Sequence, residues 1–108
     1  CENAIKPQTP MGEVFEAHRE VFNAHGSSHA KLQASGYGMR AHYTQIWVEF
    51  PMFYEGNPLL MRLNQVFFLH MILVDSETGL AMTLGHSVLV TDSGAERLSR
   101  HKLQLLEA

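Results

Sequence analysis

The sequence has a single cysteine, little excess charge and no long apolar run, and each shortage argues against a class of protein. Cys1 is the only cysteine among 108 residues, so no disulfide can form within the chain. This cysteine usage is typical of a reducing compartment, and we expect a cytoplasmic protein. The formal net charge is −3 with no basic stripe, which argues against nucleic acid and membrane as partners. The longest apolar run, Val66–Val74, is too short to cross a bilayer and contains His70.

The length predicts a single domain that spans residues 1–108. The composition is that of a globular protein, with 45% hydrophobic and 18% charged residues. The chain does not start with methionine and its first residues already belong to a pattern. We therefore expect it to be a fragment of a longer chain.

Helical periodicity follows a start signal near the N-terminus. Thr9 is expected to cap a helix whose first residue is Pro10, and Gly26 is expected to end it. The predicted helix covers residues 10–25. Its apolar face is formed by residues at helical spacing, namely Val14, Phe15, His18, Val21 and Phe22.

The second half of the chain reads as β-structure. Val66–Val74 suits a buried central strand, and Met82–Thr91 is predicted to be a second strand. The polar clusters at 75–79 and 92–94 are turn signals. One helix followed by strands predicts an α+β fold with a largely antiparallel sheet.

Four segments in this order carry a resemblance to a known fold family. They are KPQTP at 6–10, GYGMR at 36–40, VFFLH at 66–70 and SVLVTDSGAERL at 87–98. Together they resemble the second half of the pita-bread superfamily, which comprises methionine aminopeptidase, aminopeptidase P, proline dipeptidase and creatinase. The resemblance implies half of a pita-bread fold, with a long helix packed on a mainly antiparallel sheet.

The resemblance also identifies positions where these enzymes bind metal, and this chain departs from the pattern at each one. Tyr37 stands where the family has a histidine, and His70 and Gly85 stand where it has two glutamates. Dinuclear sites depend on bridging carboxylates, so we expect neither a metal site nor another cofactor. His42 resembles a histidine of creatinase, a member of the superfamily that works without metal.

These observations leave two classes of function open. The first is a metal-independent hydrolase of carbon–nitrogen bonds that resembles Xaa-Pro peptidases and creatinase. Its catalytic residues would be His42 and His70, and Tyr37, Trp47 and Glu49 would bind a small-molecule or peptide substrate. The second is a non-catalytic pita-bread-like domain for ligand binding or dimerisation. A zinc site formed by His42, His70 and His86 is a further, weaker alternative.

The resemblance and the periodicity give further expectations. Half of a pita-bread fold would leave apolar surface uncovered, so the expected partner is an upstream repeat of the same protein or a second copy. Strand alternation places His86 on the sheet face opposite Gly85, in a structural role. Two longer sets complete the expectations. The uncovered apolar surface would comprise Trp47, Phe50, Met52, Phe53 and Phe67. The histidines expected in solvent are His18, His25, His29 and His101.

Overall fold

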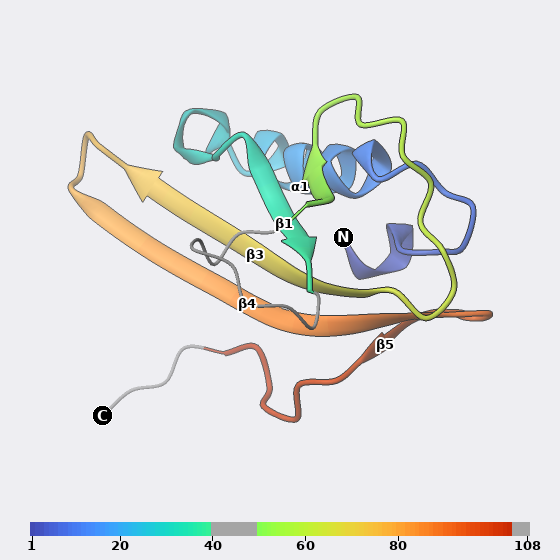
Figure 1. Cartoon of the computed structure of the whole chain (residues 1–108). Coiled ribbons are helices and arrows are strands. Elements are labelled where there is room, and N and C mark those ends of the chain that lie inside the picture. The colour runs from blue at the N-terminus through green and yellow to red at the C-terminus, as the bar shows by residue number, and fades with distance from the viewer. Residues whose placement is uncertain (40–49, 105–108) are drawn as a thin grey trace.

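A computed structural model describes residues 1–39 and 50–104 and contains one helix packed on one antiparallel sheet (Figure 1). The strand order is β2-β1-β3-β4-β5, and every neighbouring pair is antiparallel. This arrangement confirms the predicted α+β fold. The elements in chain order are η1 (Glu2–Ala4), α1 (Gly12–Ala24), η2 (Ser28–Ala30), β1 (Ala34–Gly38), β2 (Met52–Tyr54), β3 (Val66–Asp75), β4 (Leu80–Thr91) and β5 (Gly94–Arg97).

The predicted helix is confirmed, but its start differs from the expected cap. The helix begins at Gly12, and Thr9 makes no capping bond. The backbone before α1 pairs instead with the segment that leads into β3. Met61 N donates to Thr9 O at 3.0 Å, and Met11 N donates to Leu59 O at 2.8 Å. These bonds and the bridge between Pro10 and Leu60 tie the residues before α1 to the segment at 59–61, so the helix starts at Gly12 and not at Pro10.

The expectation that His18 lies in solvent is wrong. Its side chain is only 2% exposed and lies on the helix face that packs on the sheet. The ring stands between those of Phe15 and Phe22, at centroid distances of 5.8 and 4.6 Å. His18 occupies a position of the apolar stripe, and that position determines its burial more strongly than its polarity does. The other histidines of this set, His25, His29 and His101, are exposed as predicted.

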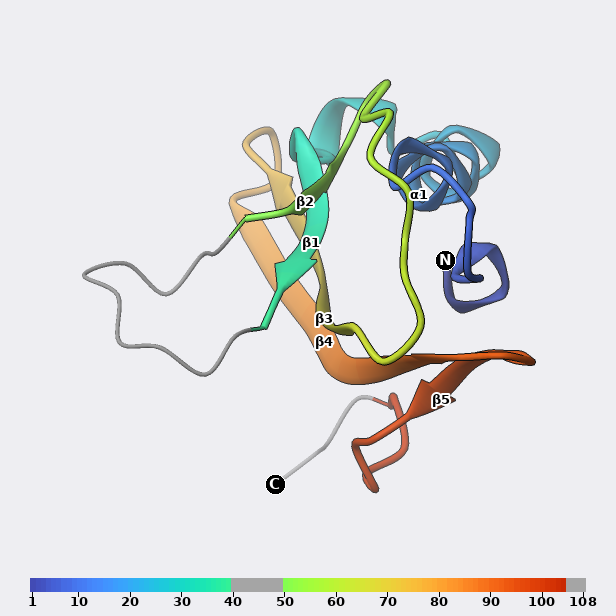
Figure 2. The same ribbon diagram turned by 45° about the vertical axis from the view of Figure 1, so that its right-hand side comes forward.

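The register between β3 and β4 determines which of their side chains lie on each face of the sheet. Leu69 is paired with His86, and His70 is paired with Gly85, in a register that runs unbroken from 66:89 to 75:80. Because side chains alternate along a strand, Leu69 and His86 face α1 whereas His70 and Gly85 face away. Figure 2 shows α1 and the N-terminal segment together on one side of the sheet.

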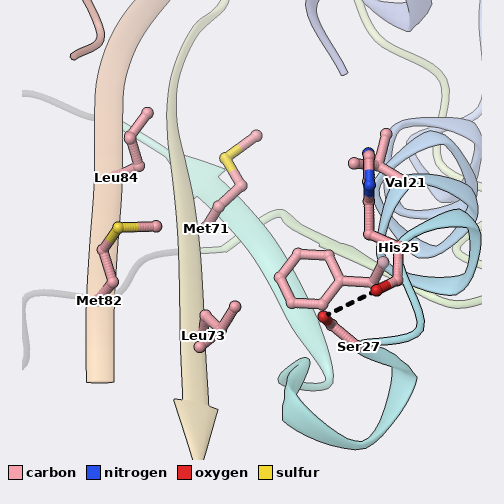
Figure 3. A pocket seen from close by; sticks show the side chains of 8 residues that line it. Val21, His25, Ser27, Met71, Leu73, Met82 and Leu84 are labelled. Carbon is pink, nitrogen blue, oxygen red and sulfur yellow. Dashed lines mark hydrogen bonds between the residues drawn. The ribbon is translucent and has the colours of Figure 1, made fainter. Parts of the chain in front are cut away.

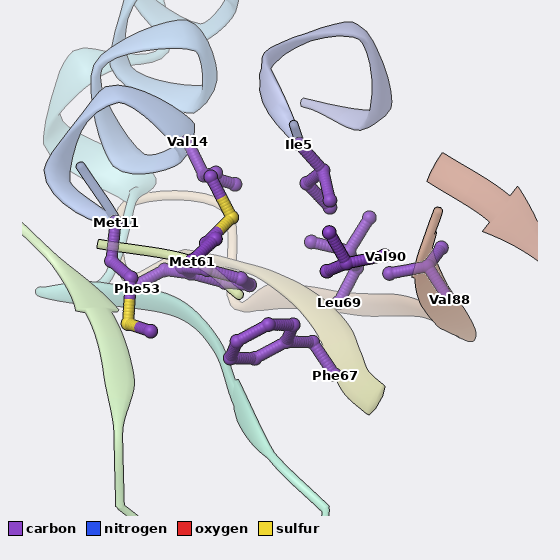
Figure 4. Close-up of a cluster of buried hydrophobic side chains, with 9 residues drawn as sticks. All are labelled: Ile5, Met11, Val14, Phe53, Met61, Phe67, Leu69, Val88 and Val90. Atoms are coloured by element: carbon purple, nitrogen blue, oxygen red, sulfur yellow. The ribbon is translucent and has the colours of Figure 1, made fainter. Parts of the chain in front are cut away.

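The hydrophobic core lies between α1, the loops around it and one face of the sheet (Figure 4). The rings of Phe53 and Phe67 meet at a centroid distance of 4.7 Å in its centre. The expectation that these two residues form uncovered surface is therefore wrong, whereas Phe50 is 63% exposed. The buried cluster consists of Ile5, Met11, Val14, Phe53, Met61, Phe67, Leu69, Val88 and Val90.

No helix within residues 1–39 and 50–104 has both the length and the apolar character needed to span a membrane.

Candidate functional site

The sheet face turned away from α1 brings together the three positions that the sequence singled out. Tyr37 of β1 is paired with Phe68 of β3, and His70 of the same strand is paired with Gly85 of β4. The three positions therefore come from neighbouring strands and lie on one face. We call this the distal face and define it by Tyr37, Phe68, His70, Thr83 and Gly85.

Three rings of the distal face form a compact group. The Tyr37 and His70 rings lie 6.2 Å apart, nearly perpendicular at 78°. Phe68 lies 5.6 Å from Tyr37 and 5.4 Å from His70, measured between ring centroids. A phenol, a phenyl and an imidazole thus share one surface on the rigid central strands, where a bound group could contact all three.

His70 and Tyr37 supply the polar chemistry of this face. His70 Nε2 is hydrogen-bonded to Thr83 Oγ1 at 2.9 Å, which orients the imidazole. The His70 side chain is only partly buried. Burial raises the pKa of the Tyr37 phenol, so this group stays protonated at neutral pH and can donate a hydrogen bond. An oriented imidazole beside a phenol donor can exchange protons with a bound molecule.

The Phe68 ring fills the space beside Gly85. A Cβ atom added at Gly85 would lie 2.6 Å from Phe68 Cζ and 3.0 Å from the carbonyl oxygen of Leu69. A longer side chain at this position would meet the same obstacle. A glutamate ligand therefore has no room at Gly85 unless Phe68 moves.

The donor set of the distal face does not fit a dinuclear metal site. Tyr37 offers a protonated phenol, His70 offers an imidazole, and Gly85 offers no donor at all. None of the three provides the bridging carboxylate that holds two cations together. Within residues 1–39 and 50–104, no three His, Cys, Asp or Glu side chains gather in a way that could hold a metal ion.

Other residues singled out from the sequence lie elsewhere. His42, Trp47 and Glu49 lie outside the described residues. His70 and His86 belong to opposite faces of the sheet, so a zinc site that uses both is wrong.

His86 takes part in a cluster that sequence reasoning missed. Its Nε2 is hydrogen-bonded to Glu2 Oε1, and Arg97 donates to the same carboxylate from Nε and Nη2 at 2.9 and 3.0 Å. The hydrogen bond from Arg97 is the main cause that lowers the pKa of Glu2, and His86 lowers it further. The cluster ties the N-terminal segment to β4 and β5. Strand alternation predicted that His86 lies on the sheet face opposite Gly85, but nothing local in the sequence indicates a partner 84 residues away.

No protein-family model matches the chain, and no curated protein sequence matches it. Solved structures do match over nearly the whole chain. Dipeptidase PepE from Mycobacterium ulcerans superposes with a TM-score of 0.84 at 20% identity, over 97% of this chain and 27% of its own. The X-Pro aminopeptidase from Thermotoga maritima superposes with a TM-score of 0.81 at 16% identity, over 95% of this chain and 28% of its own. The prolidase from Pyrococcus horikoshii superposes with a TM-score of 0.81 at 17% identity, over 97% of this chain and 29% of its own.

The chain spans between a quarter and a third of the length of these three structures. At these identities the likeness establishes the fold and not the activity. The motifs at 6–10, 36–40, 66–70 and 87–98 predicted that fold. The chain therefore has the pita-bread fold that it shares with these peptidases, over a segment of their length.

Proposed function

We propose that this chain supplies part of the active site of a metal-independent hydrolase of carbon–nitrogen bonds. The substrate would carry an amide or amidine bond in a small or proline-like molecule. The observation that carries the proposal is the convergence of Tyr37 and His70 on the distal face, at ring centroids 6.2 Å apart. The peptidase folds of the similar structures support a hydrolytic role, since all three act on peptide bonds according to their names.

The proposed step uses groups that the site contains. His70 takes a proton from a water molecule, and the resulting hydroxide attacks the carbon of the scissile bond. Tyr37 donates a hydrogen bond to the oxygen or nitrogen that gains negative charge. When the carbon–nitrogen bond breaks, the His70 imidazolium returns its proton to the leaving nitrogen. In this proposal His42 is a second base, and Trp47 and Glu49 contact the substrate.

The test measures hydrolysis of glycyl-proline and of creatine by the protein that contains this chain, with and without EDTA. Turnover is expected to persist in EDTA. His70→Ala is expected to lower kcat by about 10² to 10⁴, the usual contribution of a general base. Tyr37→Phe removes one donor and is expected to lower kcat by at least about tenfold. The control is His101→Ala, which changes an exposed histidine outside the distal face and should leave kcat unchanged.

Two results would contradict the proposal. Loss of turnover in EDTA that returns with added metal would show metal-dependent chemistry. Equal rates for His70→Ala and the unmutated protein would remove His70 from catalysis. If neither substrate is turned over but a small ligand binds in calorimetry and the binding weakens in Tyr37→Phe, the non-catalytic alternative replaces the proposal.

A further inference from the structure

A cavity of about 290 Å³ lies where the N-terminal segment meets β3, β4 and the C-terminal segment. Its lining residues are Cys1, Glu2, Asn3, Leu69, Met71, His86, Arg97 and Leu103. Leu69 and His86 are paired across the two strands and face α1, so the cavity is on the sheet side opposite the distal face. It is therefore separate from the site of the proposed hydrolysis.

His86 is the buried polar side chain of this cavity. It is 4% exposed, and its Nδ1 atom has no hydrogen-bond partner among the residues that the structure describes. Its Nε2 atom is hydrogen-bonded to Glu2, whose carboxylate also accepts two bonds from Arg97. Because the bonding to Arg97 lowers the pKa of Glu2, this carboxylate is ionised at neutral pH and can only accept hydrogen bonds. Nε2 therefore carries the proton, and Nδ1 of the neutral imidazole is left with a buried lone pair.

Two sulfur-containing side chains line the same cavity. Leu69 pairs with His86, and Met71 follows Leu69 on the same face of β3, so Met71 is the diagonal neighbour of His86. Diagonal neighbours on one face lie within reach of each other when one side chain is long, as methionine is. Figure 3 shows the Met71 side chain on the α1 side of β3. Cys1, a free cysteine, packs against the same hydrophobic cluster as Met71.

The contacts of Glu2 hold Cys1 at this cavity. Glu2 is bonded to His86 of β4 and to Arg97 of β5, and Ala4 N donates to Cys1 O at 2.9 Å. These bonds fasten η1 to the two strands, so the residue next to Glu2 stays beside them. A thiol, a thioether and an imidazole nitrogen are thereby collected around one cavity.

These three donors are of the kind that binds a soft metal ion. Thiolate and thioether sulfur select copper(I), and imidazole also suits copper, whereas magnesium and manganese prefer oxygen ligands. A histidine ligand commonly donates its other ring N–H to a carboxylate, which fixes the tautomer and orients the ring. Glu2 accepts such a bond from His86. The described residues hold no metal-binding group of three His, Cys, Asp or Glu side chains, but methionine, the third donor here, is not one of those types.

We propose that Cys1, Met71 and His86 form a copper(I) site in which His86 binds through Nδ1. The Cys1 thiol gives up its proton to solvent when the ion binds, and the thiolate neutralises the charge of the ion. Neutrality suits a partly buried site, because an unpaired charge is costly to bury. Glu2 stays bonded to His86 Nε2 and to Arg97 and is not a ligand. The expectation of no metal was based on positions of the distal face, and this site lies on the opposite face.

The test is copper(I) binding by the protein that contains this chain, measured without oxygen in competition with the chelator bicinchoninate. The unmutated protein should bind one copper ion per chain more than Cys1→Ser does. Met71→Leu and His86→Gln should each raise Kd by at least about tenfold, since even the loss of a group that orients a ligand costs about 10–100-fold. Met82→Leu is the matched control, because Met82 also faces α1 but does not line this cavity (Figure 3). Silver(I), a redox-inert ion of the same charge, should shift the nitrogen NMR signal of His86 Nδ1 more than that of Nε2.

Circular dichroism checks that each variant is folded. Met71→Leu nearly conserves the side-chain volume, so it tests the site even where His86→Gln disturbs the fold. Equal copper content in Cys1→Ser and the unmutated protein overturns the proposal. So does an equal Kd in Met71→Leu and Met82→Leu, which would assign the copper to Cys1 alone, or zinc that binds this site more tightly than copper(I). These outcomes concern binding on the α1 side and not hydrolysis, so they leave the proposed function untouched.

Discussion

Replacing His18 with leucine is expected to stabilise the fold. The His18 side chain is 2% exposed, and neither ring nitrogen has a hydrogen-bond partner in the described part of the chain. A buried polar group without a partner costs about 1–3 kcal/mol. Leucine fills a similar space between Phe15 and Phe22 and carries no polar atom. At pH 8 the free energy of unfolding of His18→Leu should therefore exceed that of the wild type by about 1–3 kcal/mol.

The same substitution should remove part of the pH dependence of stability. Burial lowers the pKa of His18 below its ordinary value of 6.5, and the nearby Lys31 lowers it further. As the pH falls below 6.5, the unfolded chain therefore binds a proton that the folded chain does not. The free energy of unfolding then decreases by up to about 1.4 kcal/mol per pH unit, until the folded-state pKa is reached. His18→Leu lacks this contribution, so its advantage over the wild type should grow between pH 6.5 and pH 5.

Urea unfolding followed by circular dichroism at pH 8, 6.5 and 5 measures both effects. His101→Leu is the control, because His101 is exposed and its replacement should change stability by no more than about 0.5 kcal/mol. If His18→Leu is less stable than the wild type at pH 8, the two ring nitrogens are not unsatisfied. If its advantage is the same at pH 8 and pH 5, His18 does not titrate differently in the two states.

Two further substitutions test the packing that shapes the site. Asn57 is 1% exposed, donates to Met52 O at 2.6 Å and accepts from Leu59 N at 3.1 Å. Asn57→Ala should cost about 1–3 kcal/mol in urea unfolding, because the Met52 carbonyl and the Leu59 N–H both lose their partner, and a cost below about 1 kcal/mol would contradict this reasoning. Gly85→Ala should cost about 1–3 kcal/mol, because its Cβ would lie 2.6 Å from Phe68 Cζ. Adding Phe68→Leu should recover part of that loss, and an unchanged melting temperature in Gly85→Ala alone would show that Phe68 does not occupy this space.

Local patterns in the sequence were sufficient to predict the main elements. Apolar residues at helical spacing predicted a helix over 10–25, and α1 covers Gly12–Ala24. The runs 66–74 and 82–91 predicted the two long strands, which are β3 and β4. Such predictions succeed because helix and strand each repeat their apolar positions with a fixed period. The same local signals failed at Thr9 and Pro10, where pairing with residues 59–61 overrides the capping signal.

The site depended on contacts that no local pattern encodes. The motifs named Tyr37, His70 and Gly85, but only the register of three strands places them on one face. The Phe68 ring lies beside Gly85 because of packing between two residues that are 17 positions apart in the sequence. Likewise, His86 lies within reach of Glu2 only after the sheet has formed. Periodicity is a property of neighbouring residues, whereas proximity across strands depends on the free energy of packing the whole chain, and only the tertiary structure determines it.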